Sequence, residues 1–252
     1  MHLEPWQWAL GVVSAFLIGV AKTGVPGLGI LIVPLMLYVI PEPRASPGAV
    51  LPLLSFADLF AVTAYRRHAQ WDRVLRLLPW VAAGLGLGMV ALWAFDRFHV
   101  PDALLTRALG AIVLVMIALQ LWRKRSGDSE PSHTLGRAAF FGASAGLATY
   151  LANAAGPVMN LYLLAMALPK AEFMGTGAWF YFIVNLVKLP QFALQGRITQ
   201  STLWVDLWLA PAVIAGALTG RVLFARIPQA LFERVILALA LVATVALLVP
   251  RG

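Results

Sequence analysis

Hydrophobic segments separated by short polar interruptions run along the whole chain. A helical membrane span needs about 20 mostly apolar residues. Measured against that length, the apolar segments lie at 8–21, 27–40, 47–65, 74–94, 102–122, 136–152, 157–168, 171–194, 203–223 and 229–249. The pattern predicts an all-α integral membrane protein.

Composition supports the same class. Hydrophobic residues make up 61% of the 252 residues and charged residues only 12%, whereas soluble domains carry about 25% charged residues. This excludes a soluble enzyme, a nucleic-acid-binding protein and a disordered chain. The net charge of +8 fits basic loops that orient membrane helices. The chain has no cysteine, which excludes disulfides and thiolate metal sites.

The order of the segments predicts two homologous repeats. A polar stretch, RKRSGDSEPSHT at 123–134, separates residues 1–122 from residues 135–252. Each half begins with a broken pair of short segments, 8–40 in the first and 136–168 in the second. Three longer spans follow in each: 47–65, 74–94 and 102–122 in the first repeat, and 171–194, 203–223 and 229–249 in the second. A shift of 127 residues places Asp58 on Asn185.

Both broken segments contain glycine and proline at matching places. The first reads AKTGVPGLG at 21–29, and the second reads TYLANAAGP at 149–157. Proline removes a backbone donor, and glycine permits conformations that a helix forbids. Such backbone persists at membrane depth only where protein or a wet cavity satisfies it. A matched pair of interruptions therefore favours a transporter binding site, with a simple proline kink as the alternative.

Two topologies are compatible with this pattern. If each broken segment crosses the membrane once, the repeats are parallel; if each is a re-entrant hairpin, the repeats are inverted. Both place 66–76 and 123–137, which hold most of the excess basic residues, on the cytoplasmic side. We expect inverted repeats, because the loop at 66–76 is much more basic than its counterpart near Arg197.

Ionisable residues within the apolar segments are the main candidates for function. Each costs about 2.5–3.5 kcal/mol at a helix centre, so it faces a partner or water. Lys22 lies at the first break, and Asp58 and Lys188 lie inside the first long span of each repeat. Asn185 precedes Lys188 by about one turn and shares its helix face. A structural ion pair between Asp58 and Lys188 is the alternative reading.

These residues predict a site for a small anion. Lys22 and Lys188 supply positive charge, and Thr23 and Asn153 supply further hydrogen-bond donors. A half-helix that starts in the break also directs free N–H groups and a positive dipole end toward an anion. Asp58 would repel that anion unless paired or protonated, so we hypothesise that it carries a coupled proton.

No catalytic or metal-binding constellation is present in the sequence. His2, His68, His99 and His133 fall at segment ends or in loops, without metal-ligand spacing. The glycines of GLGLG at 84–88 lie inside an apolar span, where they favour close helix packing rather than phosphate binding. We therefore expect no cofactor, no metal and no enzymatic activity.

The two breaks also carry a family resemblance. AKTGVPGLGILIVPL at 21–35 resembles the N-terminal signature of the sulfite exporter TauE/SafE family of membrane permeases. ANAAGPVMNLYLL and FMGTGAWFYFIVNLVKLP, within 149–190, resemble its second-half signature. Many members have a richer glycine run where this chain has KTGVPGLG, which looks like a lysine-containing subgroup.

The resemblance implies transport of a small anion, often sulfur-containing, such as sulfite, a sulfonate or a carboxylate, across a bacterial inner membrane. It implies a substrate site in the motif regions, at Lys22, Thr23, Gly24, Asn153, Gly156, Asn185 and Lys188. We expect a secondary transporter that works by alternating access at a site between the two broken segments. A passive anion channel and, more remotely, an intramembrane enzyme are the alternatives. The direction of transport and a homodimeric assembly stay open.

Overall fold

The structure is a computed structural model that describes residues 3–29, 32, 35–36, 39–40, 46–98 and 135–248. Every regular element among these residues is a helix, which confirms the all-α prediction. The expected span at 102–122, the linker at 123–134 and most of the segment at 27–40 lie outside the described residues.

The chain divides into two compact units, each drawn from both halves of the sequence. The first unit comprises Met1–Gln70 and Lys170–Phe232, and the second comprises Trp71–Pro169 and Glu233–Gly252. The expected repeats, 1–122 and 135–252, therefore do not coincide with the units of packing. A repeat is defined by sequence, whereas a packing unit is defined by which apolar faces meet.

Among the described residues, four long helices belong to the first unit. Their bounds are α1 Pro5–Thr23, α3 Ser46–Tyr65, α8 Lys170–Leu194 and α9 Gln200–Arg226, and a short 3-10 helix, η1 Arg66–His68, follows α3. Helix α1 packs along α9, and α3 packs against α8, α9 and α1. The α3–α8 contact places the first long spans of the two expected repeats side by side.

The ends of α1 and α9 follow from local capping. Glu4 and Gln7 form a reciprocal capping box at the start of α1, and Pro5 occupies the first helical position. Thr199 and Thr202 form the equivalent box at the start of α9. Because these groups satisfy free N–H groups of the first turn, the helices begin there.

Small residues bring α1 and α9 into backbone contact. A Cβ atom on Gly19 would overlap the backbone oxygen of Val213, and one on Gly216 would overlap the backbone oxygen of Phe16. Glycine at these positions allows the helices to approach closely, as is common between membrane helices. The buried apolar residues of this unit include Ala15 and Ile18 of α1 and Leu209 of α9.

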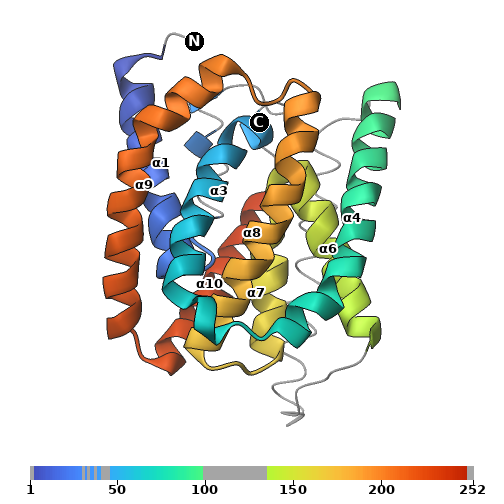
Figure 1. The fold of residues 1–252 in the computed structure, drawn as a ribbon, viewed down its shortest axis with the longest axis vertical. Helices are drawn as coiled ribbons and strands as arrows, with labels where there is room; N and C mark the ends of the chain where they lie inside the picture. The colour runs from blue at the N-terminus through green and yellow to red at the C-terminus, as the bar shows by residue number, and fades with distance from the viewer. Residues whose placement is uncertain are drawn as a thin grey trace. The chain divides into compact units, whose positions relative to one another are not determined.

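The second unit contains α4 Trp71–Phe98, α6 Leu135–Ala152, α7 Ala155–Ala165 and most of α10 Gln229–Leu248. Helices α4 and α6 lie side by side (Figure 1). A Cβ atom on Gly84 would overlap the backbone of Ala143, and one on Gly146 would overlap the backbone of Val81. The expected packing role of the GLGLG run is confirmed at Gly84, whereas Gly86 faces open space.

Three stretches of the described residues are long and apolar enough to cross a membrane: Ser46–His68, Trp71–Phe95 and Gln200–Arg226. Large apolar side chains cover the outside of the last one, including Leu207, Trp208 and Leu218. Lipid is the natural environment for such a surface. That the expected spans at 171–194 and 229–249, now helices α8 and α10, also cross the membrane stays a prediction.

Candidate functional site

An ion pair between α1 and α3 lies at the centre of the first unit. Lys22 lies in the last turn of α1, which ends at Thr23, before the predicted glycine–proline break. Its Nζ lies 2.6 Å from Oδ1 of Asp58. The Asp58 side chain is completely buried, whereas the Lys22 side chain is 15% exposed. The cation therefore lies at the more accessible end of the pair.

Helix α8 presents a polar and aromatic face to this pair. Tyr181, Asn185, Lys188 and Phe192 are spaced by four, three and four residues, which places them on one helix face. Asn185 donates a hydrogen bond from Nδ2 to Oδ2 of Asp58, at 2.7 Å. The Lys22 ammonium also lies 4.5 Å from the centroid of the Tyr181 ring. Both oxygens of the Asp58 carboxylate thus have a partner, one cationic and one neutral.

Lys188 is the most deeply buried cation of the described part of the chain, with no exposed surface. Its Nζ lies 5.5 Å from the centroid of the Phe192 ring. Lys22, Asp58 and Arg197 are the charged groups near enough to act on it. We define the polar cluster as Lys22, Asp58, Tyr181, Asn185 and Lys188. This cluster contains two lysines and one carboxylate.

Asp58 forms an ion pair with Lys22, and Lys188, the partner in the alternative reading, is also near enough to act on Asp58. A buried ion pair is retained only when each charge is well compensated, because desolvation costs several kcal/mol per ion. Asp58 receives its compensation from an ammonium and an amide of different helices. The cluster therefore joins α1, α3 and α8.

Thr23 and Gly24 lie beside the cluster but contact α9. The Thr23 hydroxyl donates to the backbone oxygen of Ala217 at 2.6 Å. The backbone oxygen of Thr23 accepts a hydrogen bond from the Tyr65 hydroxyl. A Cβ atom on Gly24 would overlap the backbone of Gly220. These two residues hold the end of α1 in place next to Lys22.

Asn153 and Gly156 belong to the second unit. Helix α6 ends at Ala152 and α7 begins at Ala155. Between them Asn153 has φ of 51°, in the left-handed region where asparagine is one of the few residues tolerated. Gly156 lies in the first turn of α7, and a Cβ atom there would contact nothing.

Tyr181 was not among the residues expected from the sequence, although it belongs to the polar cluster. Its spacing of four residues before Asn185 was the available signal, because it places the ring on the same face of α8 as the polar residues. Aromatic residues are frequent in this chain, so the spacing alone did not separate Tyr181 from a core or interfacial ring.

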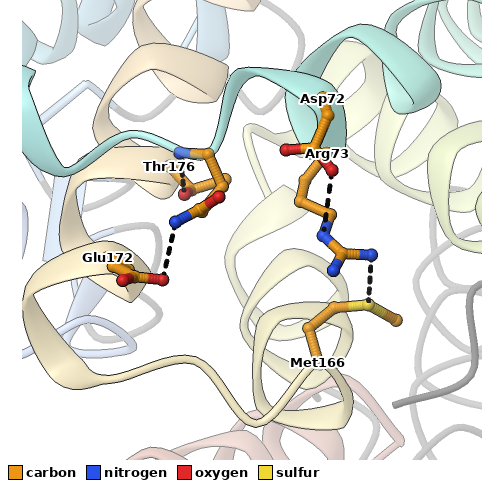
Figure 2. A network of polar contacts seen from close by, with 6 residues as sticks. Asp72, Arg73, Met166, Glu172 and Thr176 are labelled. Atoms are coloured by element: carbon orange, nitrogen blue, oxygen red, sulfur yellow. Dashed lines mark hydrogen bonds and ion pairs between the residues drawn. The ribbon is translucent and has the colours of Figure 1, made fainter.

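Two further groups of polar contacts lie outside the cluster (Figure 2). In the first unit, the Gln70 side chain donates to Glu172 at 2.8 Å, and its backbone N–H donates to the Thr176 hydroxyl. These bonds attach the segment after η1 to the start of α8. In the second unit, Arg73 lies 3.4 Å from Asp72 and contacts the sulfur of Met166.

No group of His, Cys, Asp or Glu among the described residues has the arrangement of a metal site. The polar cluster contains no histidine, serine or cysteine. What the cluster offers chemically is a group of hydrogen-bond donors, with two lysines and one carboxylate, inside a helical unit.

Comparison with known proteins gives one match. The family model described as sulfite exporter TauE/SafE matches residues 11–247 of the chain, which includes every residue of the polar cluster. No curated protein and no solved structure matched the chain.

Proposed function

The chain belongs to the sulfite exporter TauE/SafE family, and on that premise we propose that the polar cluster is the substrate site of a secondary transporter for one small sulfur-containing anion. The family is one of membrane-integral transporters of sulfur anions, so the chain is a membrane transporter and not an enzyme. Beyond family membership, we propose the location of the substrate site, the proton-coupling residue and the transport mechanism.

The observation that carries the proposal is the complete burial of Lys188 beside a compensated Lys22–Asp58 pair. A buried cation is costly unless a negative group offsets it. The cluster contains two lysines and one carboxylate, so cationic side chains outnumber acidic ones. An anion bound beside these lysines would add a negative group to the set, which makes an anion the fitting substrate.

The proposed roles follow from these contacts. Lys22 and Lys188 attract the anion, and Asn185 donates a hydrogen bond to it. Asp58 is the proposed proton-coupling group, because protonation removes its charge from the cluster. Thr23 and Gly24 contribute by holding the end of α1, since the Thr23 hydroxyl is bonded to Ala217. Asn153 and Gly156 stay proposed contributions of the second broken segment.

Internal duplication with broken helices supports a transporter mechanism, and three observations support the duplication. Asp58 and Asn185, which are 127 positions apart, contact each other, as equivalent residues next to a two-fold axis do. Shifted by 127 positions, the bounds of α4 become 198–225, close to those of α9. By the same shift Gly19 corresponds to Gly146, and each packs against the backbone of its partner helix.

Alternating access is the mechanism we propose for this architecture, with the two repeats inverted and the protein in the bacterial inner membrane. Transport would be driven by a proton gradient through Asp58 or by the gradient of the anion itself. Sulfite and organic sulfonates are the proposed substrates, with sulfur-bearing carboxylates as further candidates.

A thermal-shift screen of the purified protein tests the site. The panel comprises sulfite, sulfate, thiosulfate, an alkyl sulfonate and a small carboxylate. We expect at least one oxyanion to stabilise the wild type, because a ligand that binds only the folded state raises its stability. The same anion should not stabilise Lys22→Met or Lys188→Met, in which the methionine keeps most of the apolar stem.

Lys170→Met is the matched control. Lys170 lies at the start of α8 in the same unit, and its ammonium donates to the backbone oxygens of Phe224 and Ile227 at the end of α9. This variant should melt at a lower temperature but keep the anion-induced shift. An absence of any shift in the wild type, or equal shifts in all three lysine variants, would contradict the proposed site.

A further inference from the structure

The Asp58 carboxylate contacts the same two donor groups that a bound anion would use. Oδ1 lies 2.6 Å from the Lys22 ammonium and Oδ2 lies 2.7 Å from the Asn185 amide. We propose that Asp58 is a built-in competitor of the transported anion, which must displace it from Lys22 and Asn185 in order to bind. This inference rests on the proposed function and describes how the same site is regulated.

Displacement follows from the number of donors. The Lys22 ammonium has three N–H donors and the Asn185 amide has two. The N–H groups that point toward Asp58 can bind another anion only if that anion occupies the position of the carboxylate. Two carboxylate-sized anions side by side repel each other strongly in a buried site. The substrate and Asp58 therefore bind in turn rather than together.

Charge balance favours the exchange over simple expulsion of the substrate. Asp58 pairs with Lys22, and Lys188 lies near enough to act on the same carboxylate. When an oxyanion takes the place of the carboxylate, Lys22 keeps a negative partner. The released Asp58 side chain then gains from moving toward Lys188 or from taking up a proton, and either outcome links substrate binding to a change at α3.

Asp58 also indicates the shape of the substrate. Its two oxygens share one carbon and contact two donors on different helices, Lys22 of α1 and Asn185 of α8. Carboxylates, sulfite and sulfonates each present at least two oxygens on one central atom and can reproduce both contacts. A halide presents a single atom and cannot replace both bonds at once. We therefore expect selection for oxyanions over chloride.

Two helices supply the described groups that face Asp58. The described groups that face it are Lys22 from α1 and Tyr181, Asn185 and Lys188 from α8. Helix α9 also packs against α3 and carries Asp206, which is 9% exposed and forms no ion pair with any described residue. Asp206 is thus a second buried carboxylate of the same unit, outside the cluster.

Calorimetric affinities for sulfite and methanesulfonate test the competition. We expect Asp58→Asn to bind both anions more tightly than the wild type by about tenfold or more, equivalent to about 1.4 kcal/mol, because asparagine keeps the shape but no longer competes as an anion. Asp206→Asn, which makes the same substitution at a buried carboxyl group outside the cluster, should change the affinity by less than about threefold. Chloride should produce no measurable heat of binding with either variant.

Infrared difference spectra of the wild type provide a second readout if Asp58→Asn does not fold. Methanesulfonate contains no carboxylate, so any carboxylate band in the difference spectrum arises from the protein. We expect the band to shift on binding in both the wild type and Asp206→Asn.

Each outcome separates this inference from the proposed function. If the wild type binds an oxyanion and Lys22→Met does not, but Asp58→Asn binds no more tightly and the carboxylate band does not move, the competition is contradicted and the substrate site stands. An equal gain in Asp206→Asn contradicts it as well, because the effect is then not specific to the cluster. If the wild type binds none of the anions, the substrate site itself is contradicted.

Discussion

Lys22 and Asp58 show how a single buried contact constrains this protein. The pair is buried at the carboxylate and partly open at the ammonium. Breaking a buried ion pair by removing one partner typically costs about 3–5 kcal/mol, because the remaining charge is left without compensation. The stability of the first unit and the chemistry of its proposed site therefore depend on the same atoms.

A double-mutant cycle on this pair gives the first residue-scale prediction. We expect Lys22→Met and Asp58→Asn each to lower the melting temperature, and the double variant to lose less than the sum of the two, with a coupling of about 1–3 kcal/mol. Thermal unfolding in detergent followed by circular dichroism measures all four proteins. Strictly additive losses would show that the two side chains do not interact.

Tyr181 gives a second prediction, because its ring lies 4.5 Å from the Lys22 ammonium. A desolvated cation–π contact contributes about 2 kcal/mol or more. Tyr181→Phe keeps the ring and should unfold near the wild-type temperature, whereas Tyr181→Leu should unfold earlier. If both variants unfold at the same temperature as each other, the contact with Lys22 contributes nothing.

The sequence singled out the polar residues of the cluster, but it did not indicate which of them contact one another. Lys22, Asp58, Asn185 and Lys188 stand out because charged and amide groups are rare inside apolar segments. Which lysine pairs with Asp58 depends on the packing of α1 against α3, and no local pattern carries that information. The role of Thr23 likewise depends on the backbone of α9, which is 194 positions away.

At the scale of elements, helix pairs with small residues at their contacts organise both units. Gly19 and Gly216 bring α1 against α9, and Gly84 and Gly146 bring α4 against α6. The two pairs each combine a first segment of one expected repeat with the second long span of the other. This exchange explains why the units of packing differ from the expected repeats.

Substitution at these glycines gives the element-scale prediction. Valine at Gly19 or Gly146 would overlap the backbone of the neighbouring helix, and overpacking of this kind costs about 1–3 kcal/mol or more. Both variants should unfold at lower temperature, and Gly19→Val should also weaken anion binding because it displaces the helix that carries Lys22. Gly86→Val, on an open face of α4, is the control. A loss in Gly86→Val as large as in Gly19→Val would contradict the packing account.

Helix positions were largely predictable, since apolar length and glycine–proline interruptions are local signals. The segments expected at 47–65 and 203–223 lie within α3 and α9. The pairing of the helices was not predictable, because every apolar face in this chain is compatible with lipid as well as with another helix. Small residues indicate that a helix makes a close contact, but they do not indicate which helix is the partner.

For the whole molecule, family membership and apolar surface give a membrane transporter, and the buried cluster supplies the proposed chemistry. Removing the carboxylate separates binding from coupling: Asp58→Asn should still exchange sulfite across the bilayer but should no longer respond to an imposed pH gradient. Sulfite flux in proteoliposomes with equal and unequal internal pH measures this. A pH response equal to that of the wild type would exclude Asp58 as the coupling group.

Carrier and channel mechanisms are separated by counterflow. Alternating access predicts that vesicles preloaded with unlabelled sulfite take up labelled sulfite faster than empty vesicles, and that uptake saturates with concentration. A passive channel shows neither behaviour. Linear, non-saturating flux without acceleration by internal sulfite would contradict the carrier.

The most direct test of the central claim is sulfite flux into proteoliposomes that contain the wild type, Lys22→Met, Lys188→Met or Lys170→Met at matched protein content. The polar cluster as substrate site predicts saturable flux in the wild type and Lys170→Met, and at least about tenfold less in the two cluster variants, since removing a charged hydrogen-bonding partner costs about 1.5–3 kcal/mol or more. Flux at wild-type rates in Lys22→Met and Lys188→Met, with both variants folded, would contradict it.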